Sequence, residues 1–337
     1  MKKALVSTFK IGLASMTMTV AFSASAIIGG RSADPRIGRS SIYIFDERAE
    51  NACTGVVVHP RLILTAAHCV VNSKKESLTF SNESSPQEGR RFHLPIAELV
   101  TNEAYAGARN GIQTVTQSAG DLAIILMSEP VLSKLGLEQK DLPPIVRSVD
   151  QVTPPLRVIG YGFSSRNSRF SSTSRRELLV STRATANART LTLESMEGSR
   201  TPCFGDSGSG VFADDGSIAR LVGIVSSIRA GGKLAETFAA ETAKLRAKKE
   251  EKRQSQIAKL RQKKARDGLS TEAIEALVAE VKLEPIRLSE SLMIRVCGDV
   301  DTVTQAVPVA RHLCWIREAT SISLVPELDC PRPGVNR

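Results

Sequence analysis

Short apolar runs separated by turn residues fill the chain from residue 27 to residue 228. Gly, Pro, Ser and Asn are frequent between these runs, a pattern typical of antiparallel barrels and sandwiches. Long helical periodicity is absent from this part of the chain, so we predict an all-β body. The runs are Ile42–Phe45, Gly55–Val58, Leu62–Thr65, Leu122–Met127, Leu156–Ile159, Val211–Phe212 and Leu221–Val225.

The pattern changes to a helical one after this body. Lys233–Ala265 lacks Pro and Gly and consists mostly of strong helix formers, and Gly268 is a suitable helix stop. A second helix is predicted to begin at Ser270 or Thr271 and to end before Pro285. Its apolar positions follow helical spacing at Ile274, Leu277, Val278 and Val281. The simplest arrangement is a helical hairpin, partly solvated in its middle.

These patterns predict one domain over 27–337, interrupted at 229–296 by the helical hairpin. Strand-like sequence resumes at Leu292–Val296, and a helix is expected around Trp315. A Pro-rich C-terminal tail over 321–337 completes the chain.

The first 26 residues have the pattern of a secretory signal peptide. Basic residues come first, an apolar run over 11–22 follows, and Ala24-Ser25-Ala26 forms a small-residue cleavage site. The apolar run is too short to span a bilayer comfortably, so a retained anchor is the weaker alternative. We therefore expect a secreted or periplasmic protein with no integral membrane segment after processing.

All six cysteines follow the predicted signal peptide. An even number in an exported chain favours disulfides, and the lack of a Cys-x-x-Cys spacing argues against a zinc site. We therefore expect no zinc site. The sequence implies no other metal and no organic cofactor, with a calcium-binding loop as the open alternative. Composition alone does not choose among the alternative cysteine pairings.

Three short segments at the edges of predicted strands carry His68, Asp121 and Ser207, in that order. A serine hydroxyl becomes a good nucleophile when an imidazole removes its proton, and the imidazole needs a buried carboxylate to orient it and stabilise its charged form. Glycines flank the serine, so the backbone can turn its N–H groups toward one point, as an oxyanion hole requires. Together the segments predict a catalytic triad. They are Thr65–Cys69, Gly120–Leu126 and Gly205–Gly210.

The segments TAAHC, DLAIIL and GDSG resemble the signatures of the trypsin/chymotrypsin family of serine endopeptidases, here in an exported, bacterial-type form with a large helical insertion. The similarity covers residues 27–228 and resumes over about 296–320. It implies two antiparallel six-stranded β-barrels with the active site in the cleft between them. It also implies that His68 is the general base, Asp121 its orienting carboxylate and Ser207 the nucleophile.

The same resemblance implies further roles near the nucleophile. The backbone N–H groups of Gly205 and Ser207 would form the oxyanion hole. Ile27, which begins an Ile-Ile-Gly-Gly segment, would become the N-terminus, and its free ammonium would pair with Asp206. Because the predicted signal peptide ends at Ala26, we expect signal cleavage itself to produce this terminus.

The resemblance also pairs the cysteines. It implies a Cys53–Cys69 disulfide beside the histidine and a Cys203–Cys297 disulfide beside the specificity pocket. The second pairing makes the helical hairpin an insertion in a pocket-side loop. Cys314 and Cys330 remain, and they would tie the C-terminal helix to the tail.

Family positions suggest the substrate preference as well. Thr201 stands where an acidic residue would select Arg or Lys, and Ile228 stands where glycine is usual. We therefore expect a preference for small or medium uncharged residues. Ser226 lies on the strand that would pair with the substrate, and Phe204 is also expected to bind substrate. Thr304 is a candidate for the other wall of the pocket.

The formal net charge of +10 is concentrated in the predicted hairpin. Residues 244–266 carry 11 Lys and Arg against 2 Glu, so any anionic surface or partner is expected at Lys244–Arg266. The basic residues lack interleaved aromatics, which disfavours nucleic acid as the partner. The alternative is a solvated helical decoration without a role.

Together these features predict a secreted serine endopeptidase that cleaves proteins or peptides through an acyl-enzyme intermediate. The alternative is a protease-fold binding or toxin-like module that acts through its basic helical insertion. Replacing Ser207 by Ala separates the two, because only the enzyme would lose its activity.

Overall fold

The computed structural model describes residues 27, 29–84, 86, 90–105, 119–162, 174–182, 189–198, 200–229, 231–281, 297 and 301–330. The predicted signal peptide, the predicted strand at 292–296 and the tail beyond residue 330 lie outside the described residues.

The first half of the body is a curled antiparallel sheet of six strands, in the order β5-β2-β3-β4-β7-β6. Val57, Ile63 and Phe80 are completely buried in its core. The apolar runs predicted as strands therefore form the inner strands of one barrel. The strands are β2 (Ser41–Asp46), β3 (Asn51–His59), β4 (Leu62–Thr65), β5 (Leu78–Ser81), β6 (Ile96–Thr101) and β7 (Ala123–Met127).

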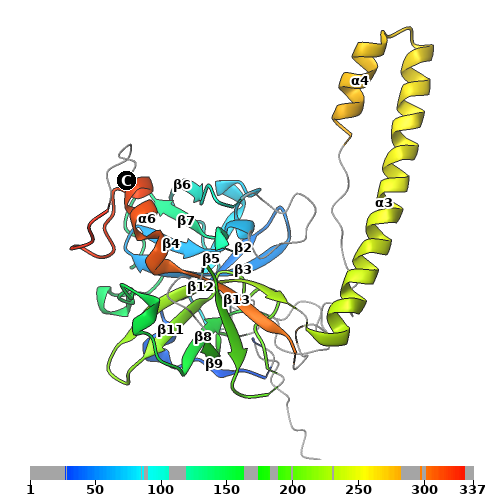
Figure 1. Cartoon of the computed structure of the whole chain (residues 1–337). Helices are drawn as coiled ribbons and strands as arrows, with labels where there is room; N and C mark the ends of the chain where they lie inside the picture. Colours follow the sequence, from blue (N-terminus) through cyan, green and yellow to red (C-terminus); the bar gives the residue numbers. More distant parts are fainter. Residues whose placement is uncertain are drawn as a thin grey trace, which may run out of the picture.

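The second half is also antiparallel, with the strand order β1-β9-β10-β13-β12-β11-β8. Strand β8 pairs back onto β9, which closes six of these strands into a barrel, and the two-residue β1 adds to the outside of β9. The predicted fold of two antiparallel barrels is confirmed (Figure 1). The strands are β1 (Arg31–Ser32), β8 (Leu156–Gly160), β9 (Arg176–Thr182), β10 (Leu191–Ser195), β11 (Gly210–Asp214), β12 (Ala219–Arg229) and β13 (Val303–Pro308).

One apolar cluster joins the two barrels. Leu64 and Ile124 of the first barrel pack in the same cluster as Ile224 of the second, and all three side chains are fully buried. The predicted C-terminal helix is present as α6 (Leu313–Thr320), and its Leu313 and Ile316 side chains belong to this cluster. The strand ends on either side of this seam are therefore held in fixed relative positions.

Short helical turns complete the described part of the body. The most relevant is η1, because it carries the predicted catalytic histidine immediately after β4. The turns are α1 (Pro35–Gly38), η1 (Ala67–Cys69), η2 (Lys75–Ser77), η3 (Gln139–Asp141), η4 (Val149–Gln151) and η5 (Val309–His312).

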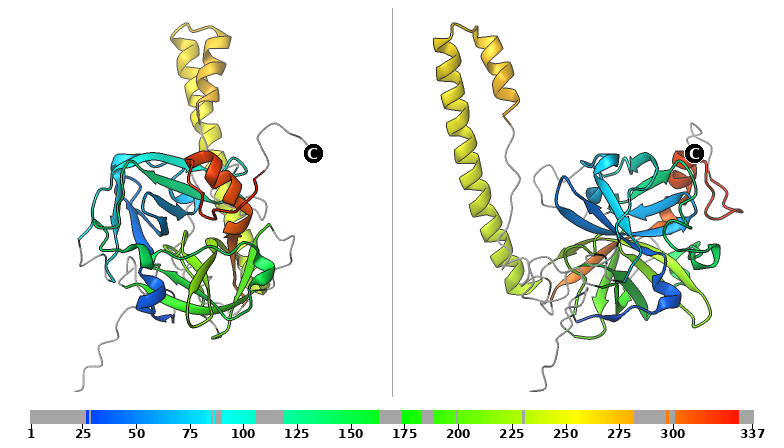
Figure 2. Two further views of the ribbon diagram at one scale, coloured as in Figure 1. Left: turned by 90° about the vertical axis from the view of Figure 1, so that its left-hand side faces the viewer. Right: turned by 180° about the vertical axis from the view of Figure 1, so that it is seen from behind.

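The predicted helical hairpin is an arm that projects from the barrels (Figures 1 and 2). It consists of α3 (Gly232–Arg266) and α4 (Thr271–Ala279). Ser270 caps α4, because its hydroxyl accepts a hydrogen bond from the Ala273 N–H at 3.3 Å. Val281 was expected in the second helix but lies beyond its end, so the apolar stripe is one residue shorter than predicted.

Few apolar side chains hold the two helices of the arm together. Ile257 of α3 and Ile274 of α4 are buried, and Arg261 forms an ion pair with Glu275 across the hairpin at 2.9 Å. Most other α3 side chains are exposed. No helix in the described parts of the chain combines the length and the apolar character needed to cross a membrane.

Candidate active site

His68 and Asp121 meet where two paired strands of the first barrel end. Strands β4 and β7 are antiparallel neighbours with Thr65 opposite Ala123, so the residues just beyond this pair are close in space. The backbone N–H of His68 donates to Asp121 Oδ1 at 2.9 Å, and His68 Nδ1 lies 2.8 Å from Asp121 Oδ2. These two contacts fix both the position and the ring orientation of the imidazole.

The surroundings of the pair shift the pKa of both His68 and Asp121. Burial alone would lower the pKa of His68, but the charge and hydrogen bond of the Asp121 carboxylate outweigh burial and raise this pKa. Burial alone would raise the pKa of Asp121, which is fully buried, yet the interactions with His68 and Ser226 lower it. The aspartate is thus held as a carboxylate that stabilises the positive form of the imidazole.

Ser226 of β12 completes the surroundings of the carboxylate. Its hydroxyl donates to Asp121 Oδ2 at 2.6 Å, and its side chain is almost completely buried. The resemblance predicts that Ser226 binds substrate through its strand, and the structure additionally gives its side chain a contact with Asp121. Local sequence carries no signal for this contact, because Ser226 is 105 residues away from Asp121 along the chain.

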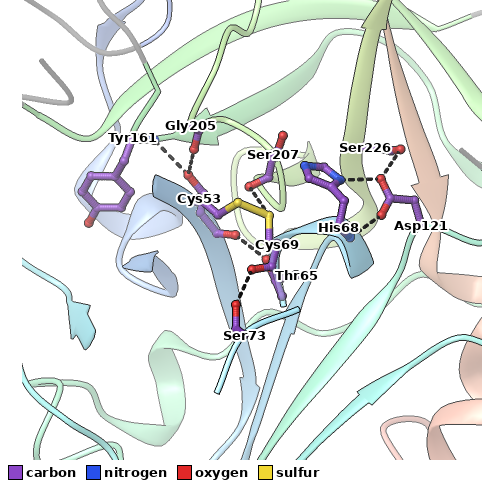
Figure 3. Close-up of a disulfide and its surroundings, with 11 residues drawn as sticks. Cys53, Thr65, His68, Cys69, Ser73, Asp121, Tyr161, Gly205, Ser207 and Ser226 are labelled. Atoms are coloured by element: carbon purple, nitrogen blue, oxygen red, sulfur yellow. Dashed lines mark hydrogen bonds and ion pairs between the residues drawn. A yellow bond between two sulfur atoms is a disulfide. The ribbon is translucent and has the colours of Figure 1, made fainter. Parts of the chain in front are cut away.

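Ser207 lies in the turn that leads into β11, next to His68. Figure 3 shows its side chain on one side of the imidazole ring, with Asp121 on the opposite side. The Ser207 carbonyl accepts a hydrogen bond from the Thr54 N–H of the first barrel at 2.8 Å. The following N–H, of Gly208, donates to Val225 of the second barrel at 2.8 Å. The serine loop is therefore attached to both barrels.

The glycines around Ser207 are required by the backbone. Gly205 and Gly208 have φ angles of +91° and +85°, in the left-handed region that side chains disfavour. A Cβ atom on Gly208 would also lie 1.9 Å from the carbonyl oxygen of Thr54. Glycine thus allows the serine loop to approach the first barrel closely.

The two N–H groups expected to form the oxyanion hole are those of Gly205 and Ser207. Neither donates a hydrogen bond to any group in the part of the chain that the structure describes. The Gly205 carbonyl, in contrast, accepts from Thr54 Oγ1 at 2.9 Å and is held in place. Donors in this arrangement are available to a substrate oxygen.

Asp206 points away from the surface and is completely buried. Its carboxylate accepts hydrogen bonds from the N–H groups of Gly162 and Cys203, each at 2.8 Å. Burial nevertheless dominates and raises the pKa of Asp206 to about 7. The Ile27 side chain is also completely buried, in the core of the second barrel.

A disulfide between Cys53 and Cys69 links β3 to the histidine turn (Figure 3). Ligand atoms of Cys53, His68 and Cys69 lie within 4.8 Å of one another. Both sulfurs are bonded in the disulfide, so neither is available as a thiolate ligand for a metal. The two cysteines therefore form a structural disulfide beside His68, and the three side chains are not suited to bind a metal.

Three of the residues expected to bind substrate lie around a second disulfide, Cys203–Cys297. Phe204 and Ile228 pack against it, and the Thr201 hydroxyl donates to the Cys297 carbonyl oxygen. Across the sheet, Thr304 of β13 lies directly opposite Ile228 of β12. Helix α3 begins shortly after β12, so the arm leaves the body beside these residues. A third disulfide joins Cys314 of α6 to Cys330.

Two antiparallel barrels with a histidine, a carboxylate and a serine at their seam define the class of double-barrel serine proteases. A model of the trypsin family matches residues 27–247, which is more than half of the chain. The chain therefore belongs to the trypsin family and carries a serine protease domain of that family.

Curated relatives agree with this assignment. Mouse vitamin K-dependent protein C is 24% identical over 220 residues, which cover 57% of this chain and 46% of the relative. Human granzyme M is 26% identical over 216 residues, covering 60% of this chain and 79% of the relative. Rat tonin is 26% identical over 226 residues, covering 62% and 80% respectively. The chain spans less than half the length of the protein C relatives. These relatives are mammalian, so they give no support to the expected bacterial type.

Proposed function

We propose that this chain is a secreted serine endopeptidase in which Ser207 attacks the peptide carbonyl carbon and forms an acyl-enzyme. His68 takes the serine proton and then gives it to the leaving amine, and a water molecule releases the acyl group by the reverse sequence. The observation that supports this best is the 2.8 Å contact between Asp121 and His68, with Ser207 on the other side of the ring.

Developing negative charge on the substrate oxygen needs preorganised donors. The N–H groups of Gly205 and Ser207 are suited to this, since they make no other hydrogen bond among the described residues. Loss of one such donor typically lowers kcat about 10²- to 10³-fold. The tight attachment of the loop to Thr54 and Val225 supports this role because it keeps the donors fixed.

Activation is proposed to follow from export. In the full chain Ile27 is preceded by Ala26, so its nitrogen is a peptide nitrogen. Cleavage after Ala26 would free an ammonium group, which would neutralise the buried Asp206 beside the oxyanion loop. N-terminal sequencing of the exported protein should give Ile27 as the first residue, and any other start would contradict this step.

The substrate residue before the cleaved bond is proposed to be small or medium-sized and uncharged. Thr201 is a neutral residue whose hydroxyl is already hydrogen-bonded to the Cys297 carbonyl. Ile228 packs against the Cys203–Cys297 disulfide, and we propose that its branched side chain narrows the pocket there. A cleavage profile over a peptide library tests this preference. Predominant cleavage after Arg or Lys would overturn it.

Labelling with a fluorophosphonate probe tests the central proposal, because the probe reacts with an activated serine. The processed protein should be labelled, and Ser207→Ala should abolish both labelling and peptide hydrolysis. Ser209→Ala is a control at a buried serine two residues further along the same loop and should keep the labelling. Failure of the correctly processed protein to react would refute the proposal, and a Ser207→Ala variant with full biological activity would favour the binding-module alternative.

A further inference from the structure

The positive charges of α3 include two sets that differ in their contacts. One set forms ion pairs within the arm: Arg253 with Glu250 at 2.9 Å, Arg261 with Glu275 at 2.9 Å, and Lys264 with Asp267 at 3.8 Å. These charges are used to hold the arm together. The second set makes no such pairs in the described structure and consists of Lys244, Lys248, Lys259, Lys263 and Arg266, all exposed.

The second set lies in a single straight row, which we call the basic row. When Lys252 and Ser255 are included, successive positions of the row are 4, 4 and 3 residues apart, and this pattern occurs twice. The pattern therefore repeats every 11 residues, which corresponds to three helical turns. This repeat stays on one side of a nearly straight α-helix. From Lys244 to Arg266 the row is about 33 Å long at 1.5 Å per residue.

The basic row faces away from the protease body. Ile257 and Arg261 mark the side of α3 that contacts α4, and the row lies on roughly the opposite side of the helix by its periodicity. Figures 1 and 2 place α4 on the body side of α3. A partner can therefore lie along the row without meeting the barrels.

Helix stability does not explain the row. Lys244 with Lys248, and Lys259 with Lys263, are like-charged pairs four residues apart, and such pairs weaken a helix. Two acidic residues of the helix, Glu241 and Glu251, lie beside the Lys244 end of the row, and none lies beside Lys259. Alternating Glu and Lys at the positions of these four lysines would stabilise the helix, so the like charges found there point to an anionic partner.

We propose that the basic row docks this protein on an anionic lipid surface. A straight row of charges can touch a flat surface along its whole length. Lysines predominate, and they act as point charges without the fixed bidentate geometry that arginine offers to individual groups. Rows of four to eight basic residues on a helix are attracted to acidic headgroups. Between Lys244 and Arg266 the row side of the helix carries no aromatic residue and a single half-buried leucine, Leu245, so the contact is electrostatic, and the helix neither inserts in the bilayer nor stacks on bases.

Vesicle co-sedimentation of the processed chain tests the proposal independently of catalysis. The protein should bind vesicles of phosphatidylcholine that contain phosphatidylserine, should ignore pure phosphatidylcholine, and should dissociate at high salt. Each row lysine replaced by Gln should lower the partition coefficient about fivefold, so Lys244→Gln, Lys248→Gln and Lys259→Gln together should lower it about a hundredfold.

A matched triple variant removes the same charge from exposed sites on the first barrel: Arg48→Gln, Lys74→Gln and Arg90→Gln. It should change binding less than about threefold, and Lys→Arg changes at the three row positions should preserve binding. Far-UV circular dichroism checks that the arm stays helical. Equal losses in the two triple variants, or no preference for the acidic vesicles, would overturn the proposal. Row-dependent binding to heparin or single-stranded DNA in place of vesicles would also overturn it and would assign a linear polyanion as the partner.

Discussion

The free-energy cost of burying the Asp206 carboxylate can be measured by comparing two proteins that differ only at the N-terminus. One protein begins at Ile27 and the other keeps Ala26, and both carry Ser207→Ala to prevent self-digestion. In the extended protein the nitrogen of Ile27 is an amide and cannot neutralise the carboxylate. Asp206 is then buried with hydrogen bonds from two N–H groups and a pKa of about 7.

This pKa sets both the direction and the size of the effect. The folded carboxyl titrates at about 7 and the unfolded one at about 3.8, so between these values the folded state binds more protons. Stability of the extended protein should therefore fall as the pH rises through this window, by about 1.4 kcal/mol per pH unit from this group. At pH 7 the accumulated cost is about 4 kcal/mol.

Urea denaturation of the two proteins between pH 4 and pH 8 measures this contribution. All titrating side chains are shared, so the difference between the two pH profiles reports the interaction of Asp206 with the terminal amino group, which is on Ile27 in one protein and on Ala26 in the other. The protein that begins at Ile27 should lack the downward slope, because its ammonium stabilises the ionised carboxylate. Asp206→Asn should remove the slope from the extended protein, whereas Asp150→Asn, at an exposed carboxyl group, should leave it. Identical slopes for the two N-termini would refute the proposed ion pair.

Other predictions concern the triad, the pocket and a disulfide. Ser226→Ala removes a 2.6 Å hydrogen bond to the triad carboxylate and should lower kcat/KM about tenfold with little change in KM; an unchanged kcat would contradict the positioning role. Because its carboxylate partner raises the pKa of His68, the acid limb of the kcat/KM profile should have its midpoint above the ordinary value of 6.5, and activity should be lost as the pH falls through it. Ile228→Gly should admit larger side chains before the cleaved bond, which a peptide library would show; an unchanged profile would remove Ile228 from the pocket. Replacing Cys203 and Cys297 by Ala opens a loop of 94 residues and should lower the unfolding free energy by about 4 kcal/mol in chemical denaturation.

Local patterns in the sequence were sufficient for the elements and for the residue types of the site. Alternating apolar runs and turn residues predict the strands because a barrel strand buries its side chains in short stretches. Lys233–Ala265 predicts α3 because helix propensity acts within the chain itself, and α3 spans Gly232–Arg266. The spacing predicts Val281 within the second helix, but α4 ends at Ala279. Apolar spacing alone does not show at which residue a helix ends.

The contacts of Asp121 show which parts of the site local sequence patterns do not predict. Its pairing with His68 was expected from the resemblance, whereas the donor from Ser226 was not. That contact depends on how β12 crosses the seam between barrels, which is determined by strand register over more than 100 residues.

The sequence by itself determined which residues are available for chemistry: a histidine, an aspartate and a serine in order, glycines around the serine, and a helix rich in lysine. The tertiary structure decided what each of them faces. It buried Asp206 with hydrogen bonds from two backbone N–H groups, attached the serine loop to Thr54, and placed α4 on the body side of α3. The physical reason is that composition and periodicity act over a few residues, whereas burial, pKa and charge exposure depend on neighbours that only barrel closure and helix packing bring together.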